Sequence, residues 1–583
     1  MGKQINFNEC PRPQFVRDSY QLLDGKWDFA FDYNNIGESK KYYKGFNKEY
    51  DIVVPFSYLC AASNVNIEKR CDNVWYQKII NIEKEKKNYF LHFEGADYLT
   101  KLYVNGKFVD KNEGGYHRFS FNITNFIKNG DNLIVVKCED DFNMQKIRGK
   151  QRWQDKNHGC WYVETTGIYK SVWLEKTPLS FVKNVKITPS LNDKKVYLEY
   201  SLANAINMKL KSTIYFDNEI INSNISKINE DNLKVEIKLK KPYHLWDLDN
   251  PALYDLKIEL INKRKIIDTV NSYFGLRELQ VKDRFIYLNG KKLYQKLVLD
   301  QGYYLTSSLT PLTNKDLYND IVKMKELGFN GCRKHEKQED ERFAYYADVL
   351  GYLIWSEIPS FYLNTLASRQ AYEKQFMKII KQNYNHPSII TWTLFNESWG
   401  IEGILNNKVL QEWVNYIYYI TKEYDPYRFV ITNDGWEHTI SDIITIHHYE
   451  QDGDKLYSYF KDLNKVLAKP YDDSNKNLFA DGYKYNNQPI MFTEFGGTAY
   501  EKNTSISTEG MKNWGYGVGV NDDIDYIKRL SKLFNALNRI DYSNGYCFTQ
   551  LSDVQQEVNG LLYIDRTDKI DPKIIKEIQD RRN

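Results

Sequence analysis

The sequence lacks the features that would tie this protein to a membrane or to a nucleic acid. It contains no run of about 18 apolar residues, so no transmembrane helix is expected. Residues 1–15 have no apolar core of the kind found in a signal peptide, so none is expected. The 80 basic and 77 acidic residues leave a net charge of +3, which gives no reason to expect a nucleic-acid partner.

The sequence also lacks paired cysteines and any spacing typical of a metal site. Its seven cysteines are odd in number and scattered, with no C-x-x-C pair, which favours a reducing compartment and predicts a cytoplasmic protein. His447 and His448 are adjacent, and on a strand neighbouring side chains point to opposite faces, so they are not expected to share an ion. No metal and no other cofactor is predicted.

The most informative residues present are two glutamates, each placed where a strand-forming segment ends. Glu397 follows the apolar run at 389–395, and Glu494 follows the run at 490–493 and precedes two glycines. Either glutamate alone would be an ordinary solvated strand end. Two carboxylates on separate strands are what a glycosidase needs, because one attacks the anomeric carbon and the other protonates the leaving oxygen.

The rhythm of the sequence divides the chain into three parts. Residues 1–178 and 179–275 consist of short alternating segments, with turn dipeptides such as Asn105-Gly106, and each predicts a β-sandwich. Residues 276–583 alternate strand-forming and amphipathic helical segments, which predicts a (β/α)₈ barrel. The eight predicted strands are Leu293–Leu297, Gly331–Lys334, Leu353–Glu357, Ile390–Asn396, Phe429–Asn433, Ile443–His447, Pro489–Glu494 and Gly545–Gln550.

Active sites of such barrels lie at the carboxyl ends of the strands, and Glu397 and Glu494 fall at the ends of strands four and seven. The segments NHPSII, WTLFNE and FTEFGG, together with LTKLYVNG and TTGIYKSVWLE nearer the N-terminus, resemble those of glycoside hydrolase family 2. That family includes β-galactosidases, β-glucuronidases and β-mannosidases. The resemblance spans nearly the whole chain and implies a sugar-binding jelly roll, an immunoglobulin-like sandwich and a catalytic TIM barrel.

The resemblance also assigns roles to residues. It implies a retaining double displacement with Glu494 as nucleophile and Glu397 as acid and base, and Asn396 would bind the substrate 2-OH. Arg333 and Tyr449 match positions that flank the nucleophile. Further expected contacts to the sugar come from loops after other strands and from the jelly-roll loop at 148–167: Asp300, His335, Trp436, Glu437, Gln550, Gln151 and Trp161.

Two positions bear on the sugar. Glucuronidases of the family carry an Asn-x-Lys motif whose lysine binds the sugar carboxylate, and the matching stretch here ends in Leu561, which cannot. Trp161 stands where an acidic residue is common, which removes an expected sodium or magnesium ligand and narrows the pocket. We therefore expect a β-galactosidase, with an α-L-arabinosidase as the alternative. A catalytically weak carbohydrate-binding protein is the alternative from another class.

The loop at 148–167 is aromatic and charged, and it is expected to reach the barrel mouth and block one side of the cleft. The expected mode of action is therefore exo, on terminal non-reducing sugars of a small oligosaccharide or glycoside. The sequence leaves a homo-oligomer open.

Overall fold

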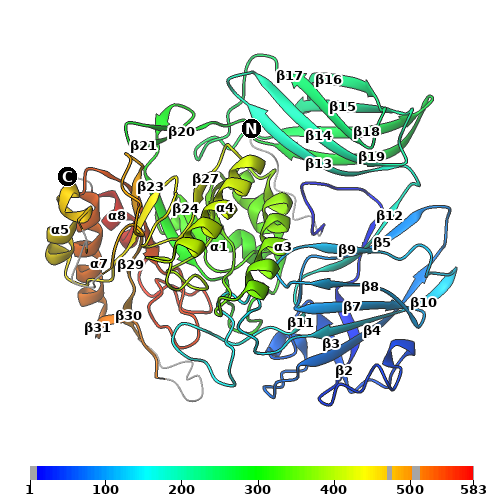
Figure 1. Cartoon of the computed structure of the whole chain (residues 1–583), viewed down its shortest axis with the longest axis horizontal. Coiled ribbons are helices and arrows are strands. Elements are labelled where there is room, and N and C mark those ends of the chain that lie inside the picture. Colours follow the sequence, from blue (N-terminus) through cyan, green and yellow to red (C-terminus); the bar gives the residue numbers. More distant parts are fainter. Residues whose placement is uncertain (1–9, 469, 471–475, 502–511, 582–583) are drawn as a thin grey trace.

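The computed structural model describes residues 10–468, 470, 476–501 and 512–581. It contains two β-sandwiches that lie on one side of a barrel (Figure 1). The first sandwich packs a four-stranded sheet on a six-stranded one, and all neighbouring strands are antiparallel. The sheets are, in order, β1 (Tyr20–Leu22), β12 (Val172–Thr177), β5 (Asn88–Phe93), β9 (Phe119–Asn122), and β3 (Tyr50–Val54), β2 (Gly25–Phe31), β4 (Asn73–Ile82), β10 (Gly130–Glu139), β7 (Leu99–Val104), β8 (Lys107–Glu113).

Alternation of apolar and polar residues forms the core of each sandwich. Along β4, Tyr76, Ile80 and Ile82 are buried in the first core, whereas Ile79 and Asn81 on the opposite face are exposed. In the second sandwich Leu198 and Tyr200 of β14 point inward in the same way. The sheets of that sandwich are β13 (Phe181–Ser190), β14 (Lys195–Ala203), β17 (Asn232–Lys238), and β16 (Glu219–Lys227), β15 (Lys209–Phe216), β18 (Tyr254–Asn262), β19 (Lys265–Phe274).

The third part is an eight-stranded parallel sheet curled into a barrel, so the predicted fold class is confirmed. The strands, in chain order, are β23 (Gln295–Asp300), β24 (Gly331–Lys334), β25 (Leu353–Glu357), β26 (Ile389–Thr393), β27 (Phe429–Ile431), β28 (Ile444–His447), β29 (Ile490–Gly496) and β32 (Ser543–Thr549). The helices are α1 (Asn314–Glu326), α2 (Glu341–Leu350), α3 (Leu366–Asn383), α4 (Lys408–Tyr424), α5 (Gly453–Phe460), α6 (Leu463–Val466), α7 (Asp523–Asn538) and α8 (Pro572–Asp580).

Small elements connect these parts. They are the 3₁₀ turns η1 (Tyr42–Lys44) and η2 (Ala61–Ser63), the short pair β6 (Ala96–Asp97) and β11 (Gly167–Ile168), the hairpin sheet β20 (Leu279–Lys282), β21 (Phe285–Leu288), β22 (Lys291–Lys292), and the pair β30 (Thr498–Tyr500), β31 (Tyr516–Val520). Among the described residues no helix is long and apolar enough to cross a membrane.

Asp442 contributes hydrogen bonds at the seam between the fifth and sixth strands of the barrel. β27 and β28 stand at the two ends of the strand order and form no ladder with each other. Asp442 bridges them, because its backbone N–H donates to the Val430 carbonyl (2.9 Å) and its carboxylate accepts from the Val430 N–H (2.9 Å). Both backbone groups at this seam are therefore paired.

The predicted first strand of the barrel is displaced. It was expected at Leu293–Leu297 and lies at Gln295–Asp300. Leu293 instead donates its backbone N–H to the Ile286 carbonyl (2.8 Å), so it belongs to the preceding hairpin sheet. The second and third strands have the predicted bounds.

The jelly-roll loop at 148–167 is fastened to the barrel. The backbone N–H groups of Arg148 and Gly149 both donate to the Ser360 carbonyl (2.9 and 3.0 Å), and the Tyr362 hydroxyl donates to the Gly149 carbonyl (2.6 Å). Gly149 has φ 58°, and a Cβ there would lie 2.1 Å from the Glu336 carbonyl oxygen. Only glycine fits this approach, so the loop is held against the barrel at a fixed point.

Candidate active site

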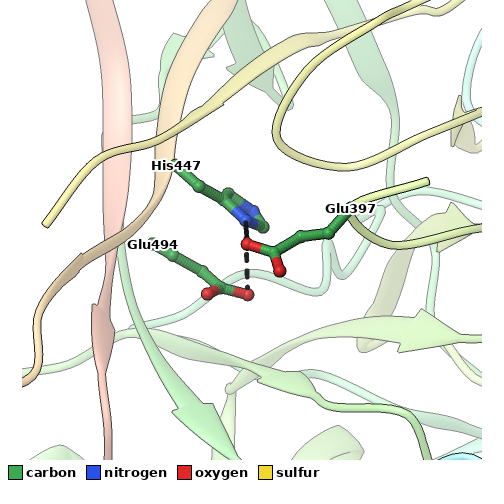
Figure 2. Close-up of side chains that lie close together, drawn as sticks. All are labelled: Glu397, His447 and Glu494. Atoms are coloured by element: carbon green, nitrogen blue, oxygen red, sulfur yellow. Dashed lines mark hydrogen bonds and ion pairs between the residues drawn. The ribbon is translucent and has the colours of Figure 1, made fainter. Parts of the chain in front are cut away.

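Glu397 and Glu494 come together at the carboxyl ends of the strands. Glu397 lies just beyond β26 and Glu494 lies in β29, and an oxygen of each is within 4.8 Å of the other and of a ring nitrogen of His447. Figure 2 shows the three side chains converging from separate segments. The fold therefore brings the two glutamates, 97 residues apart in the sequence, close to each other.

Glu494 is held as a carboxylate. Arg333 Nη1 donates to Glu494 Oε1 (3.1 Å), and the Tyr449 hydroxyl donates to Oε2. Burial acts to raise the pKa of Glu494, but the charges of His447 and Arg333 outweigh it and lower the pKa to about 2. Glu494 is therefore ionised at neutral pH, and its two hydrogen bonds fix the direction of its carboxylate.

Arg333 is fully buried and serves three carboxylates at once. Besides Glu494, its guanidinium contacts Glu357 (2.8 Å) and Asp434 (2.7 Å). It also donates to the Thr493 carbonyl (2.7 Å), one residue before Glu494. This rigid planar group fixes the position of β29 relative to β24 at the site.

Glu397 sits on a strained turn. Glu397 and Ser398 both have positive φ (50° and 61°), and the turn is secured by the Glu397 N–H donating to the Asp434 carbonyl (2.9 Å) and the Ser398 N–H donating to Asn433 Oδ1 (2.9 Å). The Glu397 side chain is 19% exposed, whereas that of Glu494 is 7% exposed. Glu397 is thus the more solvent-accessible of the two glutamates.

His447 is a member of the site that the sequence did not identify. Its Nδ1 lies 2.8 Å from Glu397 Oε1 and 3.6 Å from Glu494 Oε1, and its Nε2 lies 3.5 Å from Asp434 Oδ1. Burial acts to lower the pKa of His447, but Glu494 and Asp434 raise it to about 10, so the imidazole is protonated at neutral pH. The sequence did contain a signal for His447. It is two residues before Tyr449, so in an extended segment the two side chains point to the same side.

The cluster of Glu397, His447 and Glu494 is the one group among the described residues whose donor atoms are close enough for a metal ion. A protonated imidazole has no lone pair to offer a metal. Arg333 already places a positive charge on Glu494 as well. The donor set therefore suits a charged hydrogen-bond network better than a cation.

Asn396 and Trp436 each have an N–H group, near the two glutamates, that has no hydrogen-bond partner among the described residues. Asn396 accepts a hydrogen bond from Arg333 Nη2 (3.0 Å), which leaves its amide nitrogen without a partner among the described residues. The Trp436 ring lies 5.7 Å from that of His447, and its indole N–H is likewise unpartnered within the described chain. Such buried donors are expected to meet substrate hydroxyls.

His335 and Glu437 support the glutamates indirectly. His335 Nδ1 lies 2.9 Å from Glu357 Oε2, and burial lowers the pKa of His335. Glu437 accepts a hydrogen bond from the Ser398 hydroxyl (2.6 Å), next to Glu397. Both side chains therefore lie beside residues that hold the two glutamates, and these contacts are to protein neighbours.

Gln550 belongs to a buried polar network that includes Glu557, a residue that the sequence reasoning missed. Its amide donates to Glu557 Oε2 (3.0 Å) and Asn559 Oδ1 (2.7 Å), and it accepts from Gln301 (2.7 Å). Tyr162 of the jelly-roll loop also donates to Glu557 (2.6 Å). The loop is thereby tied to the end of strand eight.

An aromatic wall borders the site. Trp161 packs on Trp399 (ring centroids 5.7 Å apart) and on Tyr362 (5.5 Å), and Trp153 packs on Tyr362 (4.5 Å). Trp399 also faces His335 (6.1 Å). Loop and barrel therefore build this wall together, and sugar rings stack on such surfaces.

Two predicted contact residues do not face the site. Asp300 neighbours Lys334 in the ladder and bonds its ammonium (2.6 Å), and alternation puts both on the face opposite Arg333. Gln151 donates to Asp97 (2.7 Å) and accepts from the Thr165 N–H (2.6 Å), so its amide is used within the jelly roll. The position of these residues in the sequence was not enough to predict a contact with the sugar, because it does not give the direction of the side chain.

Comparison with known families identifies the family to which this fold belongs. Three family models match consecutive parts of the chain: the family 2 glycosyl hydrolase sugar binding domain at 20–178, the family 2 glycosyl hydrolase domain at 180–277 and the family 2 TIM barrel domain at 279–582. The chain belongs to glycosyl hydrolase family 2.

Relatives within the family carry different activities in their names. A putative β-glucuronidase of Formosa agariphila is 31% identical over 361 residues, covering 59% of this chain and 42% of that protein. A β-galactosidase of Thermoanaerobacterium thermosulfurigenes is 27% identical, covering 82% of this chain and 64% of that protein. This chain thus matches only about half of the length of some curated relatives.

A solved structure has the same fold over its whole length. The β-glucuronidase of Ruminococcus gnavus in complex with D-glucuronic acid superposes with a TM-score of 0.78 at 19% identity, covering 98% of each chain. At that identity the likeness concerns the fold.

Proposed function

We propose that the protein is a retaining exo-glycosidase that hydrolyses a terminal non-reducing sugar through a covalent glycosyl-enzyme intermediate. The observation that carries the proposal is the approach of Glu397 and Glu494 to within 4.8 Å. Retaining enzymes hold their carboxyl groups about 5–5.5 Å apart, whereas inverting enzymes separate them by about 6.5–9.5 Å to admit a water.

The environments of the two glutamates support different roles. Glu494, ionised and held by Arg333 and Tyr449, would attack the anomeric carbon. Glu397, more exposed, would give its proton to the departing glycosidic oxygen and then take one from the water that releases the sugar. Asn396, with a free amide N–H, would bind the 2-OH, where a hydrogen bond strengthens in the transition state.

The jelly-roll loop supports an exo mode. It closes one side of the site with Trp161, and it is anchored at Gly149. A polymer chain would have to displace this anchored loop to pass through the site. Cleavage of internal linkages in a long polysaccharide would contradict the exo mode.

Two glycones are candidates. A β-galactoside follows from the sequence, and one relative is named a β-galactosidase. An acidic sugar is favoured by a specific observation, the buried ammonium of Lys150, and relatives named as β-glucuronidases are also found. The α-L-arabinoside remains a prediction that Trp161 motivates.

The test compares the wild type with Glu494→Gln and Glu397→Gln on 4-nitrophenyl glycosides of neutral and acidic sugars. We expect kcat to fall by at least about 10⁴-fold for Glu494→Gln and by about 10²–10⁴-fold for Glu397→Gln. Glu412→Gln, on the exposed face of α4, is the matched control and should match the wild type. Proton NMR should show that the sugar is released first as the anomer with the configuration of the substrate.

Release of the inverted anomer as first product, or a Glu494→Gln variant as fast as the wild type, would overturn the mechanism. Binding of sugars without turnover of any glycoside would instead support the carbohydrate-binding alternative.

A further inference from the structure

Lys150 is a buried cation at the edge of the site. It follows the anchor residue Gly149, and only 6% of its surface is exposed. Its ammonium nitrogen lies 4.4 Å from the centroid of the Trp399 ring, two residues beyond Glu397. The jelly-roll loop therefore delivers a positive charge to the wall of the sugar site.

The charge of Lys150 has no counter-ion close to it. No carboxylate of the described residues lies within 4.0 Å of its ammonium. Burial acts to lower the pKa of Lys150, but the nearby Cys160 and Glu557 raise it, so the group stays charged. Cys160 is hydrogen-bonded to Lys150, but burial raises the pKa of Cys160 to about 11, so this neighbour is a neutral thiol at neutral pH and supplies no negative charge.

The acidic groups that act on Lys150 from a distance are occupied elsewhere. Glu557 accepts hydrogen bonds from Tyr162, Gln550 and Asn559. Glu494 is paired with Arg333. Burying an ammonium without a counter-ion costs several kcal/mol, so an arrangement of this kind indicates a negative charge supplied by a ligand.

Lys150 is also held in place from both sides. Its carbonyl accepts from the Tyr162 N–H (2.9 Å), and the preceding carbonyl, that of Gly149, accepts from the Tyr362 hydroxyl (2.6 Å). Its backbone is therefore fixed and its side chain is buried against Trp399, so binding a ligand should cost less conformational entropy than it would for an exposed lysine.

We propose that Lys150 binds an anionic group on the glycone, so that the substrate is an acidic glycoside. The anion is a carboxylate, as in a uronosyl residue, or a sulfate ester. The proposal rests on the glycosidase function above and names its substrate class. It replaces the expectation that Leu561 excludes acidic sugars: Leu561 is fully buried in the barrel core, and the cation comes from the jelly roll instead.

The test measures kcat/KM on 4-nitrophenyl β-D-glucuronide, β-D-galacturonide, β-D-galactoside 6-sulfate, β-D-glucoside and β-D-galactoside. We expect the wild type to prefer an acidic substrate over its neutral counterpart by at least about tenfold. Lys150→Met should lower kcat/KM on the acidic substrate by about 10–100-fold, mainly through KM, and Lys150→Arg should recover part of it. The uronides and the sulfate distinguish the two sources of the anion.

Lys156→Met, which removes an exposed lysine from the same loop, is the matched control and should retain the wild-type ratio of acidic to neutral hydrolysis. A wild-type preference for the neutral galactoside would overturn the proposal. An equal loss on acidic and neutral substrates in a Lys150→Met variant with unchanged melting temperature would also overturn it. Failure of the glycosidase function itself would be recognised differently, by the absence of turnover on every substrate of the panel.

Discussion

The Nδ1 atom of His447 lies 2.8 Å from Oε1 of Glu397. The same nitrogen lies 3.6 Å from Glu494 Oε1, so one imidazole links the proposed acid/base and the proposed nucleophile (Figure 2). Asp434 faces its other nitrogen at 3.5 Å. The charge of His447 is therefore set by three carboxylates, and its proton can respond when the charge of either glutamate changes during turnover.

Replacing His447 by asparagine should impair catalysis. The variant removes a charged donor from both glutamates, and loss of such a donor typically lowers kcat by about 10²-fold. We expect kcat to fall by that amount and KM to change little. The measurement is steady-state hydrolysis of the preferred glycoside, with its pH profile.

His448→Asn is the matched control. His448 is next in sequence, but its ring packs on Phe460 (5.0 Å) away from the glutamates. It should keep most of the activity and the wild-type pH profile. If both variants lost activity equally and kept the same profile, His447 would have only a structural role.

His447 should also make stability depend on pH on the alkaline side. Its pKa is raised from 6.5 to about 10 in the folded state, so its contribution is fully present below pH 6.5 and is lost as pH rises toward 10. The melting temperature of the wild type should exceed that of His447→Asn most at pH 6, and the difference should shrink by pH 10. A difference independent of pH would contradict this account.

Glu494 should contribute in the opposite direction on the acid side. Its pKa is lowered from 4.5 to about 2 in the folded state, so the stabilisation is present above pH 4.5 and is lost as pH falls toward 2. Differential scanning calorimetry of the wild type and Glu494→Gln between pH 7 and pH 3 measures this. The wild type should lose stability relative to the variant as pH falls below 4.5; a constant difference would show that the carboxylate is not paired.

Gly149→Ala should displace the jelly-roll loop. The added Cβ would lie 2.1 Å from the Glu336 carbonyl oxygen at a φ of 58°. We expect a loss of about 1–3 kcal/mol in the free energy of unfolding and about 10²-fold in kcat/KM, because Lys150 and Trp161 move with the loop.

Gly130→Ala is the control that separates the effect of backbone strain from the effect of displacing the jelly-roll loop. Gly130 also has positive φ (86°), but a Cβ there meets nothing within 4 Å. It should cost about 1 kcal/mol of stability and leave kcat/KM unchanged. Equal losses of activity in the two variants would show that the loop anchor does not matter for catalysis.

The sequence predicted the architecture well because hydrophobic periodicity determines it. The strands at Gly331–Lys334 and Leu353–Glu357 lie where apolar runs predicted them. The placement of Glu397 and Glu494 near the ends of strands could be predicted for the same reason. A carboxylate that follows a buried apolar run is expected at the mouth of the barrel or at the protein surface.

Side-chain direction and loop contacts were less accessible. Asp300 was expected at the site, but its register beside Lys334 turns it away, and register depends on strand pairing that the sequence does not display. Lys150 resembles any loop lysine until the loop is seen docked on the barrel at Gly149. His447 was considered only as a metal ligand, and once that role was rejected the sequence offered no other reason to place it in the site.

The most direct test of the central claim is to identify the residue that carries the sugar in the covalent intermediate. The enzyme is incubated with the 2-deoxy-2-fluoro fluoride of its preferred glycone, digested with pepsin and analysed by mass spectrometry. We predict one equivalent of fluorosugar on the peptide containing Glu494 and no label in Glu494→Gln. A label on Glu397 or Glu357 would contradict the assignment of Glu494 as the nucleophile, and so would complete turnover with no label at any time.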